Sequence, residues 1–74
     1  MYMSNVLGTR ISDLLKQNGL SQKELAGRIG VTNVSMSRYI NGDRIPKGSV
    51  IVNIATALQV DAGYLLGIAT AVED

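Results

Sequence analysis

Residues 21–24 are Ser-Gln-Lys-Glu, and this short pattern constrains the fold more than any other feature of the 74-residue chain. A hydroxyl followed three residues later by a carboxylate forms a capping box, in which both side chains bind backbone N–H groups at the start of a helix. Leu25 and Ile29 then recur at helical spacing, and Gly30 can end the helix with a positive φ. The pattern therefore predicts a short amphipathic helix that starts at Gln22.

A second helix is predicted after a turn of about three residues. Thr32 is its candidate N-cap, Met36 and Tyr39 lie on one face, and Asn41-Gly42 ends it. Two short helices joined so tightly must cross steeply. That geometry is a helix-turn-helix.

Burying Met36 and Tyr39 turns the opposite face of the second helix outward. The residues on that face are Thr32, Asn33, Val34, Ser37 and Arg38. Arginine pairs with guanine, asparagine with adenine and an apolar group with the thymine methyl in the major groove. We therefore expect this face to contact DNA bases. The alternative for Arg38 is an exposed ion pair with Asp13, Glu24 or Asp43, worth about 0–1 kcal/mol.

The stretch resembles the helix-turn-helix of phage repressors and Cro-type regulators, the xenobiotic-response-element family. The matching residues are Gln22, Leu25, Ala26, Ile29, Gly30, Val31, Met36, Tyr39, Asn41, Gly42 and Pro46, followed by Ile54, Ala55, Leu58, Asp61 and Tyr64 to Gly67. The resemblance implies an all-α fold, a compact five-helix lambda-repressor-like domain with the helix-turn-helix formed by helices 2 and 3. It also implies a transcriptional regulator, with repression as the expected activity.

Helical stripes flank the motif on both sides. The first predicted helix is capped by Ser4 or Asn5 and ends at Asn18-Gly19, with an apolar stripe of Leu7, Ile11, Leu14 and Leu15. A fourth helix is predicted from Lys47 or Ser49 to Leu58, and a fifth from the Asp61 cap through Leu66, with Gly67 as its stop. We expect one domain over residues 1–67 and a short C-terminal tail over 68–74.

Two glycines lie inside predicted helices. Gly8 and Gly27 should each lower helix stability by roughly 1 kcal/mol relative to alanine. Their presence is explained either by local tolerance of this cost or by another backbone that comes too close for a side chain.

The sequence departs from the family pattern in two places. Family members often carry an acid where Ile40 stands, so an apolar contact with Leu15 is expected to replace an ion pair. Val50 and Val52 should be partly exposed beside Ile51. With the apolar tail residues Ile68, Ala69, Ala71 and Val72, they could form a dimer contact.

Phosphate contacts are expected around the base-reading face. Gln22, at the start of a helix, can donate to a phosphate together with the free backbone N–H groups there. The resemblance also implies a phosphate contact for Asn41, with Arg44 and Lys47 following the DNA backbone. The alternatives are a plain helix-start residue for Gln22, a C-cap for Asn41 and solvated charges for Arg44 and Lys47.

The charge distribution agrees with this placement. The whole chain has a net charge of only +1, but residues 16–47 hold six basic and two acidic side chains, a net of +4. Residues 61–74 hold three acids and no base, a net of −3. The positive part of the chain therefore coincides with the helix-turn-helix.

The composition argues against several other classes of protein. Because the chain has no Cys and no His, it lacks disulfides, thiolate metal sites and the commonest general base. Its acids are widely spaced and it has no phosphate-binding loop, so we expect neither an enzyme nor a cofactor or metal site. No apolar run approaches the roughly 20 residues needed to span a bilayer, and no signal peptide is evident. We expect a cytoplasmic protein.

The expected partner is double-stranded DNA with a pseudo-palindromic operator, bound by a homodimer. Regulators of this kind place two copies on half-sites about 34 Å apart. The rival interpretation is a protein-interaction module of the same fold, such as an antitoxin or coactivator. A partner groove would favour large apolar anchors on the outward face of helix 3, whereas DNA favours the polar set found there.

Overall fold

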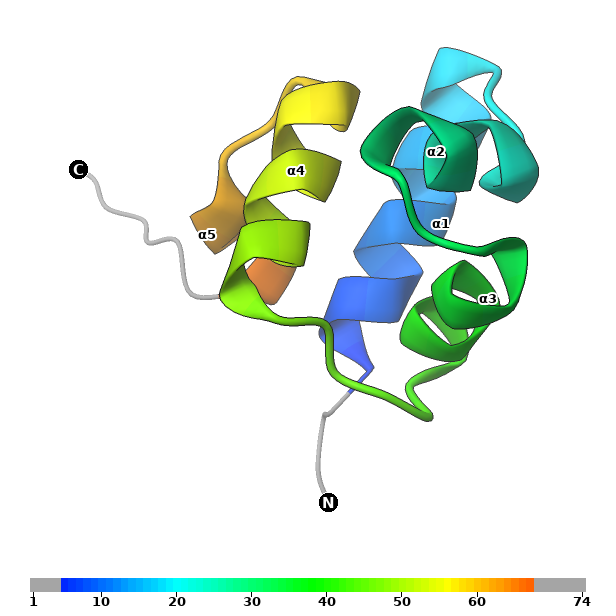
Figure 1. The fold of residues 1–74 in the computed structure, drawn as a ribbon. Helices are drawn as coiled ribbons and strands as arrows, with labels where there is room; N and C mark the ends of the chain where they lie inside the picture. The colour runs from blue at the N-terminus through cyan, green and yellow to red at the C-terminus, as the bar shows by residue number, and fades with distance from the viewer. Residues whose placement is uncertain (1–4, 68–74) are drawn as a thin grey trace, which may run out of the picture.

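The computed structural model describes residues 5–67, which form five helices and no strand. In chain order they are α1 (Val6–Asn18), α2 (Gln22–Ile29), α3 (Asn33–Asn41), α4 (Gly48–Leu58) and α5 (Ala62–Leu66). Figure 1 shows α2 and α3 on one side of α1 and α4 and α5 on the other. The all-α, five-helix fold predicted from the sequence is confirmed. The expected apolar tail contact lies outside the described residues.

Side-chain caps fix where three of the helices begin. The Ser21 hydroxyl accepts from the Glu24 backbone N–H at 3.0 Å, and the Glu24 carboxylate accepts from the Ser21 N–H at 2.9 Å. The Thr32 and Asp61 side chains likewise accept from backbone N–H groups and cap α3 and α5, as predicted. Because each cap satisfies a donor that the helix leaves open, the sequence sets these boundaries locally.

The start of α1 differs from the expectation. Asn5 occupies the N-cap position, but its side chain makes no capping hydrogen bond. Its side-chain oxygen instead lies between Gly8 on α1 and Gly42 at the end of α3, within 3 Å of where a Cβ on either glycine would stand. Ser4, the other candidate cap, lies outside the described residues. Asn5 therefore packs α1 against α3.

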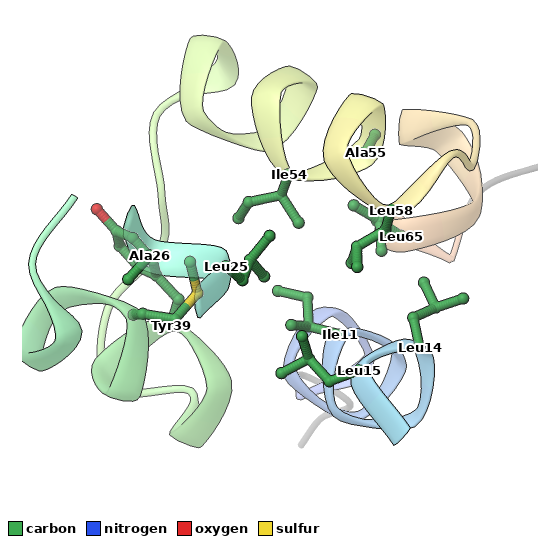
Figure 2. Packing of buried hydrophobic residues seen from close by; sticks show 11 residues of the cluster. Ile11, Leu14, Leu15, Leu25, Ala26, Tyr39, Ile54, Ala55, Leu58 and Leu65 are labelled. Atoms are coloured by element: carbon green, nitrogen blue, oxygen red, sulfur yellow. The ribbon is translucent and has the colours of Figure 1, made fainter. Parts of the chain in front are cut away.

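One apolar core joins all five helices, and most of its members are seen in Figure 2. Its buried residues are Ile11, Leu14, Leu15, Leu25, Ala26, Met36, Tyr39, Ile54, Ala55, Leu58 and Leu65. Ile40 packs against the same cluster that holds Leu15, so both residues serve the apolar core. Burial of each large side chain contributes about 1.5–3 kcal/mol, which makes this cluster the main source of stability.

The two helical glycines have different explanations. A Cβ on Gly8 would overlap the carbonyl oxygen of Ile40 and lie 2.7 Å from its carbonyl carbon, so α1 and α3 touch backbone to backbone. A Cβ on Gly27 would meet nothing within 4 Å. Close approach therefore accounts for Gly8, and local tolerance for Gly27.

One arginine adds a polar contact between the last helix and the first. The Arg10 guanidinium donates to the Tyr64 carbonyl oxygen at 2.7 Å and lies 4.3 Å from the centre of the Tyr64 ring. A cation over an aromatic face is worth about 0.5–1 kcal/mol at an exposed site. This contact fixes α5, although it has only five residues, against α1.

Candidate nucleic-acid interface

The turn between α2 and α3 is built from local backbone bonds. Gly30 takes a left-handed conformation, with φ 76°, and the Val31 N–H donates to the Ala26 carbonyl at 3.1 Å. Thr32 then opens α3, and its hydroxyl accepts from the Ser35 N–H at 3.0 Å. These contacts hold the two helices at a fixed angle, as a helix-turn-helix requires.

The inward and outward faces of α3 are as predicted. Met36 is fully buried and Tyr39 is only 8% exposed, whereas Val34 is 64% exposed. Asn33 and Arg38 are exposed on the same outward side. Ser37 is half-buried, so it is the least accessible of the five expected base-reading residues. Burial of Met36 and Tyr39 therefore presents an amide, a guanidinium and an apolar side chain to solvent together.

Thr32 is exposed, but its hydroxyl is already engaged. Besides accepting from the Ser35 N–H, it donates to the Ser35 hydroxyl oxygen at 3.0 Å. A hydroxyl has one hydrogen to give, so Thr32 has no free donor for a base while this bond holds. Its hydroxyl oxygen keeps one acceptor site for an outside donor.

A contact that the sequence did not reveal joins the starts of the two helices. The Gln22 Nε2 donates to the Asn33 Oδ1 at 3.0 Å and to the Asn33 carbonyl oxygen at 3.3 Å. This bond orients the Asn33 amide, since its oxygen faces Gln22 and its two N–H donors point elsewhere. Both residues are the first of their helices. An amide at each of these positions is the only sequence signal of the contact.

The far end of α3 leads into an exposed basic loop. The Asn41 Nδ2 lies 3.5 Å from the Ser37 hydroxyl oxygen, a long hydrogen bond. Arg44 and Lys47 are exposed, which fits a phosphate contact and solvated charges equally, and Lys47 occupies the N-cap position of α4. Ile45, between them, is 85% exposed, which the sequence did not predict.

The capping box also affects charge near the interface. The backbone N–H of Ser21 donates to the Glu24 carboxylate and, with the Ser21 hydroxyl, lowers the pKa of that carboxyl below its usual value. Since the carboxylate is bound to Ser21, pairing with Arg38 would have to compete with the cap. The capping box therefore argues against Glu24, one of the three acids considered for Arg38, as its ion-pair partner.

Two negative findings concern the described part of the chain. No group of three or more acidic, His or Cys side chains within residues 5–67 comes close enough to hold a metal ion. In the same range no helix combines the length and the apolar character that crossing a bilayer would take.

These features define a class of protein: a small all-α domain with a capped helix-turn-helix whose second helix faces solvent with base-reading side chain types. The chain matches the helix-turn-helix family over residues 4–65, and it belongs to that family.

Individual relatives support the assignment. The chain is 35% identical over 51 residues to the HTH-type transcriptional regulator YqaE of Bacillus subtilis (strain 168), covering 69% of this chain and 44% of that protein. It spans about half the length of the curated relatives it matches.

Solved structures agree with the fold. The P22 c2 repressor in complex with a synthetic operator matches with a TM-score of 0.76 and 30% identity, over 80% of this chain and 89% of that one. The regulator of biofilm formation SinR in complex with DNA also matches with a TM-score of 0.76, at 28% identity, over 81% of this chain and 97% of that one.

Proposed function

We propose that this chain binds double-stranded DNA sequence-specifically and acts as a transcriptional regulator, a repressor, with α3 in the major groove. The observation that carries the proposal is the outward face of α3, where Asn33, Val34 and Arg38 are exposed together beside a fixed turn. Family membership and two structural relatives solved with DNA support it. The protein would act in the cytoplasm as a binding protein and not as an enzyme.

Base reading is assigned to three outward side chains. Arg38 can donate two hydrogen bonds to guanine, and Val34 can pack against thymine methyl groups. The Gln22 bond leaves the Asn33 N–H donors free, so Asn33 is set to meet a base-edge acceptor without first rotating. Such a fixed side chain loses less entropy on binding than a free one. Thr32 and Ser37 have supporting roles.

Positioning on the duplex is assigned to polar groups around α3. The Gln22 Nε2 donates to both the side-chain and the carbonyl oxygen of Asn33. Gln22 would therefore exchange the longer of these bonds to hold a phosphate together with the backbone N–H groups at the start of α2. Asn41, Arg44 and Lys47 would hold phosphates on the other side of the groove. Such contacts fix the register and supply salt-dependent affinity that is independent of sequence.

The assembly on DNA would be a homodimer on a pseudo-palindromic operator. Half-sites read by a two-fold dimer lie about 34 Å apart, one turn of the duplex. The described protomer measures 35 × 27 × 22 Å, so two copies side by side can place their α3 helices at this spacing. Sedimentation that finds one protomer per two-half-site operator at saturation would contradict the dimer.

The test separates reading from positioning. Duplexes selected from random sequence would be titrated with the wild type, Arg38→Ala and Gln22→Ala by fluorescence anisotropy at several salt concentrations. We expect Arg38→Ala to lose about 1–3 kcal/mol at one guanine-containing position and to relax the preference there. Equal weakening on operator and random DNA would remove Arg38 from the base-reading set.

Gln22→Ala should act differently. Loss of a phosphate contact weakens binding on every sequence, and loss of the Asn33 bond adds a further loss at the base that Asn33 reads. A double-mutant cycle with Asn33→Ala should therefore give a coupling of about 0.5–1 kcal/mol on operator DNA. Purely additive losses would show that the bond does not orient Asn33 in the complex.

The same fold serving only as a protein-interaction module is the rival function. A helix that docks in a partner's groove presents several large apolar anchors. On the outward face of α3, Val34 is the one large apolar side chain among polar neighbours. A steep fall in duplex affinity with rising salt would support DNA binding, and no measurable affinity at low salt would support the rival.

A further inference from the structure

The loop between α3 and α4 carries the most exposed large apolar side chain of residues 5–67. Ile45 is 85% exposed, and Val34 follows at 64%. Val34 is the second residue of α3, whereas Ile45 comes shortly after Asn41, the last residue of that helix. The two most exposed apolar side chains therefore lie near opposite ends of one helix, the helix proposed to enter the major groove.

Pro46 sets the direction in which Ile45 points. The Pro46 side chain is buried, and Lys47 after it has an extended backbone, with φ −64° and ψ 158°. A residue that precedes a proline is itself restricted to extended conformations. In extended chain, the residues before and after an inward side chain both point away from it. Ile45 and Lys47 therefore share the outward side of the loop, and both are exposed.

Cations lie on both sides of Ile45 in the sequence. Arg44 precedes it and Lys47 follows two residues later, and the one acid of the loop, Asp43, lies at the α3 end. Three residues span at most about 10 Å, so the two cations can reach phosphates that are close together on one DNA strand. Between two such phosphates lies a deoxyribose, which presents C–H groups. The loop thus offers charge, apolar surface and charge in the order in which a DNA strand offers their partners.

An exposed apolar residue is common on protein surfaces and by itself indicates nothing. Ile45 differs from such a residue because its direction is fixed by a buried proline and because its neighbours are cationic. A pocket on a partner protein would need acidic groups beside it to match Arg44 and Lys47. The DNA backbone supplies anionic and apolar groups together, so it is the better match.

We infer that Ile45 is a DNA-contacting residue, which packs against the deoxyribose between the phosphates held by Arg44 and Lys47. This inference deepens the proposed function and rests on it. The contact is independent of sequence, because every nucleotide has the same sugar. Its contribution to affinity is also independent of salt, because burying apolar surface releases no counterions.

The test removes the apolar side chain and measures affinity at several salt concentrations. The wild type, Ile45→Ser and Ile45→Val would be titrated by fluorescence anisotropy against a duplex with one half-site and against a random duplex, so that association between copies does not enter. We expect Ile45→Ser to bind both duplexes about fivefold to tenfold more weakly at every salt concentration. Ile45→Val keeps most of the apolar surface and should stay within about twofold of the wild type.

The salt dependence distinguishes an apolar contact from an ionic one. A plot of the logarithm of the association constant against that of the salt concentration should have the same slope for Ile45→Ser as for the wild type, because no phosphate contact is lost. Arg44→Ala should instead make the slope shallower by about one. A shallower slope for Ile45→Ser would mean that the substitution displaces the neighbouring cations, and it would overturn the inference.

Leu66→Ser is the matched control. Leu66 is also an exposed aliphatic residue, but it ends α5, which lies on the opposite side of α1 from α3 (Figure 1). This variant should bind like the wild type, and thermal unfolding checks that every variant folds. The inference is overturned if Ile45→Ser binds like the wild type, if its loss is confined to one of the two duplexes, or if Ile45→Val or Leu66→Ser loses as much affinity.

The outcome is separable from the fate of the proposed function. A wild type that binds the half-site, with Ile45→Ser unaffected, would keep DNA binding and leave Ile45 to a protein partner. A wild type that binds neither duplex at low salt would end the proposed function and this inference with it.

Discussion

Gly8 and Gly27 offer a matched pair for testing how α1 is packed against α3. Both lie inside helices, and by helix propensity alone either change to alanine should stabilise the fold by about 1 kcal/mol. The surroundings differ. A Cβ on Gly27 would enter open space, whereas one on Gly8 would overlap the Ile40 carbonyl group.

The obstruction at Gly8 is backbone, so it cannot rotate aside as a flexible side chain would. Forcing an extra carbon into a filled site costs typically 1–3 kcal/mol, and an overlap this severe belongs at the upper end. Against the gain in propensity, Gly8→Ala should lower the free energy of unfolding by about 1–2 kcal/mol. Gly27→Ala should raise it by about 1 kcal/mol.

Thermal and urea unfolding followed by circular dichroism would measure both changes. For a domain of this size each kcal/mol corresponds to about 4–8 °C in Tm. The two variants should therefore move in opposite directions from the wild type, with equal m-values. If Gly8→Ala proved as stable as Gly27→Ala, the close backbone contact between α1 and α3 would be refuted.

Two further predictions concern the helix ends. Gln59 ends α4 with a φ of 60°, a conformation that residues with a side chain rarely adopt. Gln59→Gly should therefore raise the free energy of unfolding by about 1 kcal/mol in urea titrations. A loss of stability would mean that the Gln59 side chain contributes more than its backbone conformation costs. Because Ser21 lowers the pKa of Glu24 in the folded state, the stabilisation from this carboxylate is present above the unfolded pKa of about 4.3 and is lost as the pH falls through the lower folded value. The free energy of unfolding of the wild type, measured from pH 7 to pH 2, should fall relative to that of Glu24→Gln below about pH 4. A difference between the two proteins that stays constant with pH would contradict the capping role.

Much of the fold follows from local chemistry that is visible in the sequence. Ser21, Thr32 and Asp61 cap helices because a short oxygen-bearing side chain can reach nearby N–H groups in the same turn. The inward position of Met36 and Tyr39 follows from helical periodicity. The outward face of α3 was predictable for the same reason, since fixing one face of a helix fixes the other.

The features that escaped prediction depend on how distant segments meet. The bond between Gln22 and Asn33 exists only once the turn brings two helix starts together. Asn5 was one of two candidate caps for α1, but its side chain makes no capping bond and its oxygen lies between Gly8 and Gly42. Exposure of Ile45 follows from the course of the loop, which has no periodicity to predict it.

Under the proposed function, the direct contact of Gly8 with the Ile40 carbonyl limits how this domain could acquire new DNA targets. No side chain lies between the two backbones at that point. The orientation of α3 relative to α1 therefore cannot be adjusted by exchanging an intervening side chain for a smaller or larger one. New operator preferences would then arise by exchanging the outward residues at 33, 34 and 38 on an unchanged frame. Changes of DNA target would then alter the residues proposed to contact the bases, while the orientation of α3 in the domain stays constant.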